Sequence, residues 1–180
     1  MMRYHIWTIG CQMNAADSQR LASALERLGY AWTDRVDGAD VVVLNTCVVR
    51  QQAEDKVYGR LGSLARLKAA RPGVVIALTG CLVGHKPSPR LSERFPLVDV
   101  FLPPSQTAPL VDYLADRSTG ADAAAVEGDD VVARWRVQDD AAPGALLLPA
   151  PDRGSLVSAH IPVVYGCNRA CSYCIVPFTR

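Results

Sequence analysis

The sequence lacks a long hydrophobic run, a secretory leader and an excess of charge of either sign. No stretch reaches the ~20 consecutive apolar residues of a membrane helix, so no membrane partner is expected. The first residues do not form a signal peptide, because polar Gln12 and Asn14 arrive before any long apolar core. The formal net charge of the 180 residues is only +1, so no global field indicates a nucleic-acid partner. These absences, with a hydrophobic fraction of 49%, favour a globular cytoplasmic protein.

What the sequence does have is six cysteines, an even number that would allow a disulfide framework in a secreted protein. Without a leader, grouped cysteines are more often metal ligands or catalytic groups. Three of them follow the spacing Cys-x-x-x-Cys-x-x-Cys at Cys167, Cys171 and Cys174. Thiolates are the usual ligands of iron–sulfur clusters, and three of them on a four-iron cubane leave one iron free for a small molecule. The spacing therefore predicts a reactive cluster site.

A zinc site is the main competing interpretation of these three cysteines. Zinc normally requires a fourth His or Cys ligand and commonly uses paired Cys-x-x-Cys units. His160 is the only such residue nearby, and it falls in an expected strand. The cluster is therefore the favoured interpretation.

Expected strands and helices alternate through the first two thirds of the chain. Runs of β-branched and apolar residues predict the strands, and leucines at helical spacing predict the helices. This alternation predicts an α/β fold with an open parallel sheet flanked by helices. The expected strands cover residues 4–10, 40–44, 73–79 and 98–102, and the expected helices run from about Asp17 to 28, over 50–70 and over 108–116.

The other three cysteines, Cys11, Cys47 and Cys81, each follow one of these strands. Because the carboxyl ends of parallel strands meet at one edge, we expect the three thiols to emerge together where open α/β sheets bind ligands. Three convergent thiols can hold a second cluster by the same chemistry as the first set. Buried structural cysteines are the alternative, since free cysteine is often a small core residue.

A change of composition divides the chain. Gly, Ala, Asp and Pro dominate residues 118–155, which predicts a linker between a domain at 1–117 and a second one that starts at 156–180. Within the linker, residues 131–137 form a possible short strand, where Arg134 and Arg136 flank Trp135 as a solvated face rather than a nucleic-acid contact. Residues 156–165 are the expected first strand of the second domain.

Four ordered segments hold the six cysteines: Gly10-Cys11-Gln12-Met13-Asn14, Asn45-Thr46-Cys47-Val48-Val49-Arg50, Thr79-Gly80-Cys81 and the loop of Cys167, Cys171, Tyr173 and Cys174. Together they resemble the radical S-adenosylmethionine methylthiotransferase family over almost the whole chain. Gln12-Met13-Asn14 and Val49-Arg50 are most similar to the branch that makes 2-methylthio-N6-isopentenyladenosine beside the tRNA anticodon.

The resemblance implies a methylthiotransferase amino-terminal α/β domain followed by the truncated beginning of a radical S-adenosylmethionine partial (β/α) barrel. It implies two [4Fe–4S] clusters, an auxiliary one on Cys11, Cys47 and Cys81 and a radical-generating one on Cys167, Cys171 and Cys174. S-adenosylmethionine would bind the open iron of the latter, with Tyr173 near its adenine. One S-adenosylmethionine would methylate sulfur at the auxiliary cluster, and a second would yield the radical that removes hydrogen from carbon 2 of the adenine.

The implied partners are a tRNA substrate at its anticodon stem-loop, an electron donor such as flavodoxin or ferredoxin, and a sulfur donor. Asn14, Asn45 and Thr46 are expected to shape the cluster loops rather than to react, because short polar side chains suit turns. The branches that act on threonylcarbamoyladenosine or on a ribosomal protein, and a non-catalytic iron–sulfur carrier, are the alternatives. The chain is expected to be a fragment of a longer enzyme and to be inactive in isolation.

Overall fold

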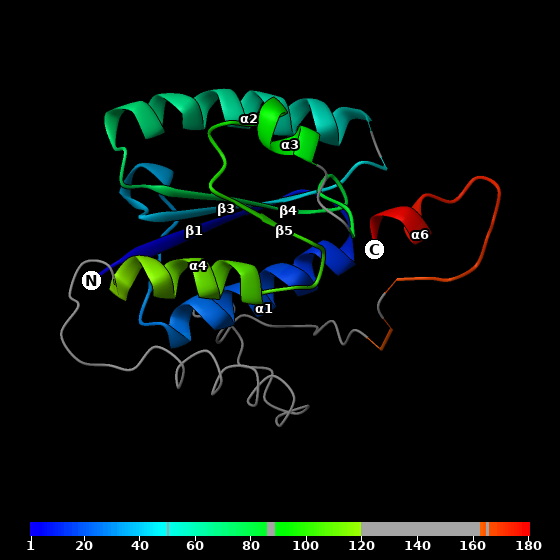
Figure 1. Cartoon of the computed structure of the whole chain (residues 1–180), viewed down its shortest axis with the longest axis horizontal. Helices are drawn as coiled ribbons and strands as arrows, with labels where there is room; N and C mark the ends of the chain where they lie inside the picture. Colours follow the sequence, from blue (N-terminus) through cyan, green and yellow to red (C-terminus); the bar gives the residue numbers. More distant parts are fainter. Residues whose placement is uncertain (50, 86–88, 120–162, 165) are drawn as a thin grey trace.

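The computed structural model describes residues 1–49, 51–85, 89–119, 163–164 and 166–180. Within these residues, five parallel strands form one sheet in the order β2-β1-β3-β4-β5, with helices on both faces (Figure 1). The predicted open parallel α/β sheet is therefore confirmed. The elements are β1 (Arg3–Thr8), α1 (Gln12–Arg27), β2 (Ala31–Trp32), η1 (Val36–Gly38), β3 (Val41–Thr46), α2 (Gln51–Ala70), β4 (Val75–Gly80), α3 (Pro89–Arg94), β5 (Val100–Leu102), α4 (Ala108–Thr119) and α6 (Val176–Thr179).

Strand β3 lies at the centre of the sheet and shows why the fold has three layers. All six of its residues are buried, which requires cover on both faces. Val41 and Val43 belong to the core beneath α1 and α4, whereas Val42 and Leu44 belong to the core beneath α2. Side chains alternate between the faces of a strand, so a continuous apolar run supplies both cores. Figure 1 shows these two helical layers, with α2 and α3 on one side and α1 and α4 on the other.

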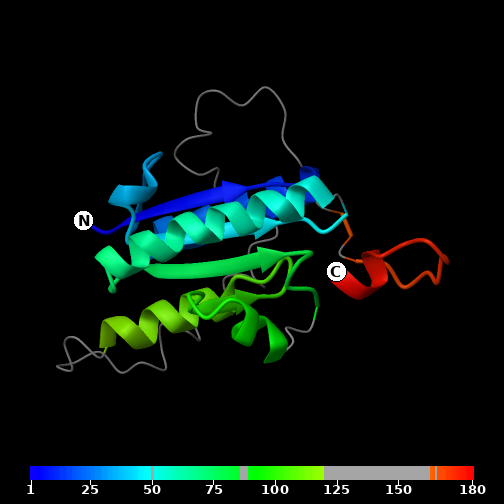
Figure 2. The ribbon, with the colours of Figure 1, turned by 90° about the horizontal axis from the view of Figure 1, so that it is seen from above.

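The strand order also places a binding crevice. In the order 2-1-3-4-5 the connections run in opposite directions from β1 and β3, and ligands of such sheets bind at the carboxyl ends of these two strands. Thr8 pairs with Asn45, and Asn45 pairs with Thr79, so β1, β3 and β4 end at the same level. Figure 2 shows the strand arrows pointing toward the segment that contains α6.

The first helix begins earlier than the expected start at Asp17. It starts at Gln12, with Cys11 as its extended N-cap residue. The amide oxygen of Asn14 accepts the Cys11 backbone N–H at 3.5 Å, which satisfies one of the free donors at the helix start. The first turn holds no apolar stripe to mark it, so the hydrophobic periodicity gave the boundary late.

Several predictions from the sequence fall outside the described residues. They are the linker beyond residue 119, the strand at 131–137, and residues 156–162 and 165 of the strand at 156–165. Helix α4 continues to Thr119, two residues into the expected linker. Across the part of the chain that the structure describes, no helix combines the length and hydropathy that a bilayer crossing requires.

Candidate metal centre at the carboxyl edge of the sheet

Cys11, Cys47 and Cys81, here called the first cysteine set, line one cavity of about 460 Å³ at the carboxyl edge. They follow β1, β3 and β4, the strands that end level with one another. Cys47 and Cys81 are 5% and 7% exposed, and Cys11 is exposed. The expectation that these three thiols emerge together at one edge is confirmed.

A buried network of amides lies directly beneath the first cysteine set. The Asn14 amide donates to Asn45 Oδ1 at 2.7 Å and to the Thr46 carbonyl at 2.9 Å. The Asn45 amide returns a hydrogen bond to the Asn14 carbonyl at 2.8 Å and donates to Ser18 Oγ at 2.9 Å. All of Asn14, Asn45 and Thr46 are fully buried, where an unpaired polar group would cost about 1–3 kcal/mol. These side chains therefore fix the loops after β1 and β3, which is the role that the sequence predicted for them.

The network reaches the thiol of Cys11 itself. The Cys11 Sγ–H donates to Asn14 Oδ1 at 3.3 Å, from the first turn of the helix that Cys11 caps. The same asparagine joins α1 to the end of β3, two residues before Cys47. One buried side chain thus positions two members of the first cysteine set.

A glycine allows the third cysteine to approach the other two. Gly80 has φ +95°, and a Cβ on it would lie 2.2 Å from the Thr46 carbonyl oxygen. This close approach lets the Cys81 N–H donate to that carbonyl at 3.0 Å, just past the last paired residues of β3 and β4. No residue other than glycine fits here without moving the backbone of Thr46.

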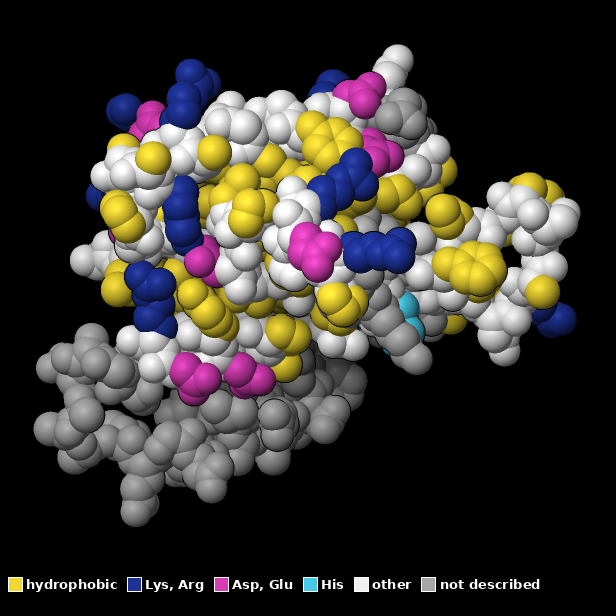
Figure 3. Space-filling view, turned by 45° about the horizontal axis from the view of Figure 1, so that its top comes forward, with side chains coloured by type: hydrophobic (Ala, Val, Ile, Leu, Met, Phe, Trp, Pro, Cys, Tyr) yellow, Lys and Arg dark blue, Asp and Glu magenta, His cyan; other side chains and the backbone are white. Residues whose placement is uncertain are grey.

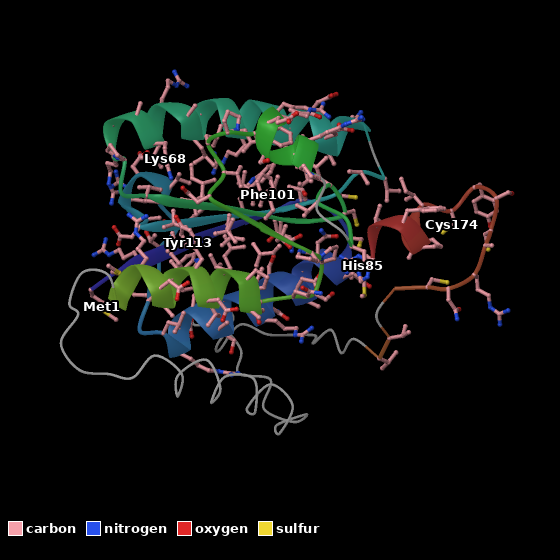
Figure 4. All side chains as sticks on the ribbon, viewed as in Figure 1. Met1, Lys68, His85, Phe101, Tyr113 and Cys174 are labelled. Carbon is pink, nitrogen blue, oxygen red and sulfur yellow. The ribbon has the colours of Figure 1, made fainter. Side chains whose placement is uncertain are left out.

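Cys167, Cys171 and Cys174, the second cysteine set, lie on residues 166–180, here called the cysteine loop. Cys167 and Cys171 are exposed and Cys174 is partly buried. The Cys174 N–H donates to the Cys171 carbonyl at 3.1 Å, which forms a turn before α6. Figure 4 places Cys174 beside α6 at the far end from the sheet.

The cysteine loop exposes apolar side chains. In the space-filling view it projects from the body of the domain with hydrophobic groups on its surface (Figure 3). Tyr173 is 93% exposed and Phe178 is 78% exposed. The position of Tyr173 next to an adenine therefore stays a prediction, since no described residue packs over its ring.

The cavity has a second wall that comes from the end of the chain. The cavity is lined by the first cysteine set together with Val164, Gly166, Val176, Thr179 and Arg180. Sequence reasoning did not identify Arg180 or its contact with Asn14, because the two residues are 166 positions apart along the chain. Local sequence patterns do not predict contacts between residues so far apart in the sequence.

Arg180 carries a buried charge beside the cavity. Burial lowers the pKa of its guanidinium, but the negative charge of Asp17 and, to a lesser extent, the nearby Cys81 side chain outweigh that cost and raise the pKa above its usual value. Arg180 therefore stays charged at any pH at which the protein is folded. The wall of the cavity therefore includes a charged arginine that is paired with Asp17.

The residues present can be tested against the two kinds of metal group. In the described ranges, no three His, Cys, Asp or Glu side chains stand close enough to bind one common metal ion. A single zinc, with Zn–S bonds of about 2.3 Å, would require the sulfur atoms to lie about 4 Å apart. A cubane cluster instead binds each thiolate through a different iron, so its ligands are spread around a wider guest. Three thiols around a shared cavity therefore fit a cluster better than a single ion.

The fold and the site define a class: an open parallel α/β domain that presents three thiols at the switch point of its sheet. Residues 3–103 match the family model described as "Uncharacterized protein family UPF0004". The chain therefore belongs to this family, which is the amino-terminal domain of methylthiotransferases, and the resemblance predicted from the sequence is confirmed.

Curated relatives match nearly the entire chain. A tRNA-2-methylthio-N(6)-dimethylallyladenosine synthase of Clostridium novyi (strain NT) is 40% identical over 179 residues, which cover 99% of this chain and 37% of the relative. Proteins of the same name from Herpetosiphon aurantiacus and Roseiflexus sp. are 36% and 37% identical over 178 residues, which cover 99% of this chain and 36% and 33% of those relatives. The chain thus spans about a third of the length of the curated relatives it matches.

Proposed function

We propose that the chain acts in a tRNA methylthiotransferase that inserts a methylthio group at carbon 2 of N6-isopentenyladenosine beside the anticodon. The name of the relatives, which match 99% of the chain, supports this substrate. The observation that carries the proposal is the cavity lined by Cys11, Cys47 and Cys81, because it gathers three thiols from distant segments at the ligand-binding edge of the sheet. A tRNA substrate places the reaction in the cytoplasm.

The six cysteines divide into two sites in this proposal. Cys11, Cys47 and Cys81 would hold an auxiliary [4Fe–4S] cluster, and the second cysteine set would hold the cluster whose open iron binds S-adenosylmethionine. When bound, these groups supply a sulfur source, a methyl donor and the radical needed to remove an unactivated hydrogen. Tyr173 would lie against the adenine of S-adenosylmethionine. An electron donor and a sulfur donor complete the set of proposed partners.

The protein's own residues supply position and shielding. Asn14 and Asn45 fix the loops that bear Cys11 and Cys47, and the tight contact at Gly80 brings Cys81 beside them. Cys47 and Cys81 are almost buried, so solvent reaches a guest in the cavity mainly from the side of Cys11. The proposed division into an amino-terminal domain at 1–117, a linker at 118–155 and a radical domain that starts at 156–180 assigns one cysteine set to each domain.

A second candidate function is an iron–sulfur carrier that passes clusters on without catalysis. The exposure of Cys167 and Cys171 favours it, because a cluster on this loop would be open to exchange with a partner. Binding of S-adenosylmethionine distinguishes the two functions. A carrier should not bind S-adenosylmethionine after reconstitution, whereas the methylthiotransferase should bind it, and binding should disappear when the second cysteine set is replaced by alanine.

Iron and sulfide quantification after anaerobic reconstitution tests the two-site assignment. The chain should hold about eight irons, and replacing either cysteine set by alanine should remove about half of them. Ser172→Ala, which changes an exposed side chain between two cysteines of the same loop, should leave the iron content unchanged. Zinc near one per chain with no iron would contradict the proposal.

A hybrid protein tests the tRNA substrate. Residues 1–180 would replace the matching segment of the Clostridium novyi relative, and the hybrid would be expressed in cells that lack this modification. Mass spectrometry of digested tRNA should detect the 2-methylthio nucleoside with the hybrid and not with its Cys47→Ala variant. An active hybrid that adds a methylthio group to a different nucleoside would contradict the proposed substrate, but it would support the proposed reaction.

A further inference from the structure

The buried ion pair between Arg180 and Asp17 has no part in the proposed chemistry. Arg180 Nη1 lies 3.0 Å from Asp17 Oδ2, and the two side chains are only 7% and 4% exposed. Asp17 also accepts a hydrogen bond from Ser105 Oγ at 2.8 Å, in the turn between β5 and α4. Removing two charges from water is costly, and losing one partner of a buried pair would leave the other charge buried and uncompensated.

Arg180 touches the groups that support the first cysteine set. Its Nη2 donates to Asn14 Oδ1 at 3.5 Å, the oxygen that also accepts from the Cys11 thiol. The Cys81 side chain lies close enough to the guanidinium to help raise its pKa. A single guanidinium therefore contacts the surroundings of two of the three thiols in the cavity.

Arg180 also closes the cysteine loop. Gly166 has φ +69°, and a Cβ on it would lie 2.8 Å from the carbonyl oxygen of Arg180. The two ends of the loop thus meet backbone to backbone, with the whole second cysteine set between them. Both ends line the cavity of the first cysteine set.

We infer that Arg180 is a positioning residue: its ion pair with Asp17 holds the closed neck of the cysteine loop, Gly166 and Arg180, over the cavity of the first cysteine set. The two sets of ligands are thereby held in one fixed mutual arrangement. The identity of the groups that they hold rests on the proposed function, but the docking of the neck does not. The arginine acts through the backbone that it anchors and not through contact with a substrate.

Site-resolved alkylation of the reduced, iron-free chain tests the docking. Arg180 lies beside Cys81 at the same cavity, and Cys81 is only 7% exposed. Arg180→Met should therefore raise the rate at which Cys81 reacts with N-ethylmaleimide by about ten-fold relative to exposed Cys171. Asp17→Asn should give a rise of the same order. The matched control is Arg169→Met, which removes an exposed arginine of the same loop and should leave the rate at Cys81 unchanged.

A double variant shows whether Arg180 and Asp17 act as a pair, even if each single variant is less stable. When two residues act as one pair, Asp17→Asn together with Arg180→Met should expose Cys81 no more than the worse single variant does. Additive effects, or an unchanged rate at Cys81 in Arg180→Met, would overturn the inference. Arg180→Lys, which keeps the charge but not the forked geometry, should restore part of the protection.

A spectroscopic readout separates positioning from simple stability. After reconstitution and reduction, electron paramagnetic resonance of the unaltered chain should show magnetic interaction between two clusters, and Arg180→Met should lose it at equal iron content. Equal interaction in both proteins would overturn the inference while leaving the proposed function intact. A chain that binds no iron at all would overturn the proposed function, and the alkylation result would still decide the docking.

Discussion

The two cysteine sets reach their positions by different routes. Cys11, Cys47 and Cys81 come from three strand ends, and backbone pairing, buried amides and a glycine contact fix them. The second cysteine set lies on one short loop that attaches to the domain through its neck. The first site is a product of the whole fold, whereas the second is a product of local sequence and one buried ion pair.

This difference has consequences for how each site responds to mutation. Changes near the first cysteine set should alter the stability of the sheet domain and the site together, since the same hydrogen bonds serve both. Changes at exposed positions of the cysteine loop, between its neck residues Gly166 and Arg180, should alter only the local site. Unfolding measurements on the iron-free chain can therefore separate the two regions.

The largest effect is expected at the contact between β3 and β4. Gly80→Ala should lower the free energy of unfolding by about 3 kcal/mol or more, because the new Cβ would lie 2.2 Å from the Thr46 carbonyl oxygen at a positive φ. Urea denaturation followed by circular dichroism measures this loss. The matched control is Gly62→Ala in α2, where nothing lies within 4 Å, and which should stabilise the helix by about 0.5–1 kcal/mol. Similar stability of the two variants would mean that the strand ends are not held as tightly as described.

The asparagine beneath the first cysteine set should give the next largest effect. Asn14→Ala leaves Asn45 Oδ1 and the Thr46 carbonyl without their shared donor inside the core, which should cost about 2–3 kcal/mol. Asn168→Ala removes the same side chain from an exposed position of the cysteine loop and should change stability by less than about 0.5 kcal/mol. Denaturant unfolding of both variants measures the contrast. An equal loss in the two would remove the distinction between a fold-built site and a local one.

Much of this molecule could be predicted from its sequence because its strongest patterns are local. The buried run at β3 requires cover on both faces. Each cysteine of the first set comes shortly after a recognisable strand end, so the shared edge follows from the parallel topology. The start of α1 was placed late because the polar residues Asn14 and Asp17 occupy buried positions near its start, so no apolar stripe marks it. The two-residue strand β2 is too short to produce a pattern.

The attachment of the cysteine loop could not be predicted for a different reason. Arg180, Asp17 and Ser105 are ordinary polar residues in their own segments, and only the folded chain brings them together. Burial of a charge depends on three-dimensional surroundings that no periodicity encodes. A glycine directly before a cysteine, at Gly10, Gly80 and Gly166, is a local signal of close contacts, which at Gly80 and Gly166 are with backbone atoms.

The smallest expected effect on stability comes from removing a single thiol from each of the two cysteine sets. In the iron-free chain, Cys47→Ala removes a sulfur that is 5% exposed and should cost about 1 kcal/mol through lost packing, whereas Cys171→Ala should change the free energy of unfolding by less than about 0.5 kcal/mol. Denaturation of the two variants under reducing conditions measures both values. A clear loss of stability in Cys171→Ala would show that the exposed loop contributes to the fold even without its metal. A larger loss of stability in Cys47→Ala than in Cys171→Ala, as expected, would mean that Cys171 serves only as a ligand. Cys47 would then serve both as a ligand and as part of the core.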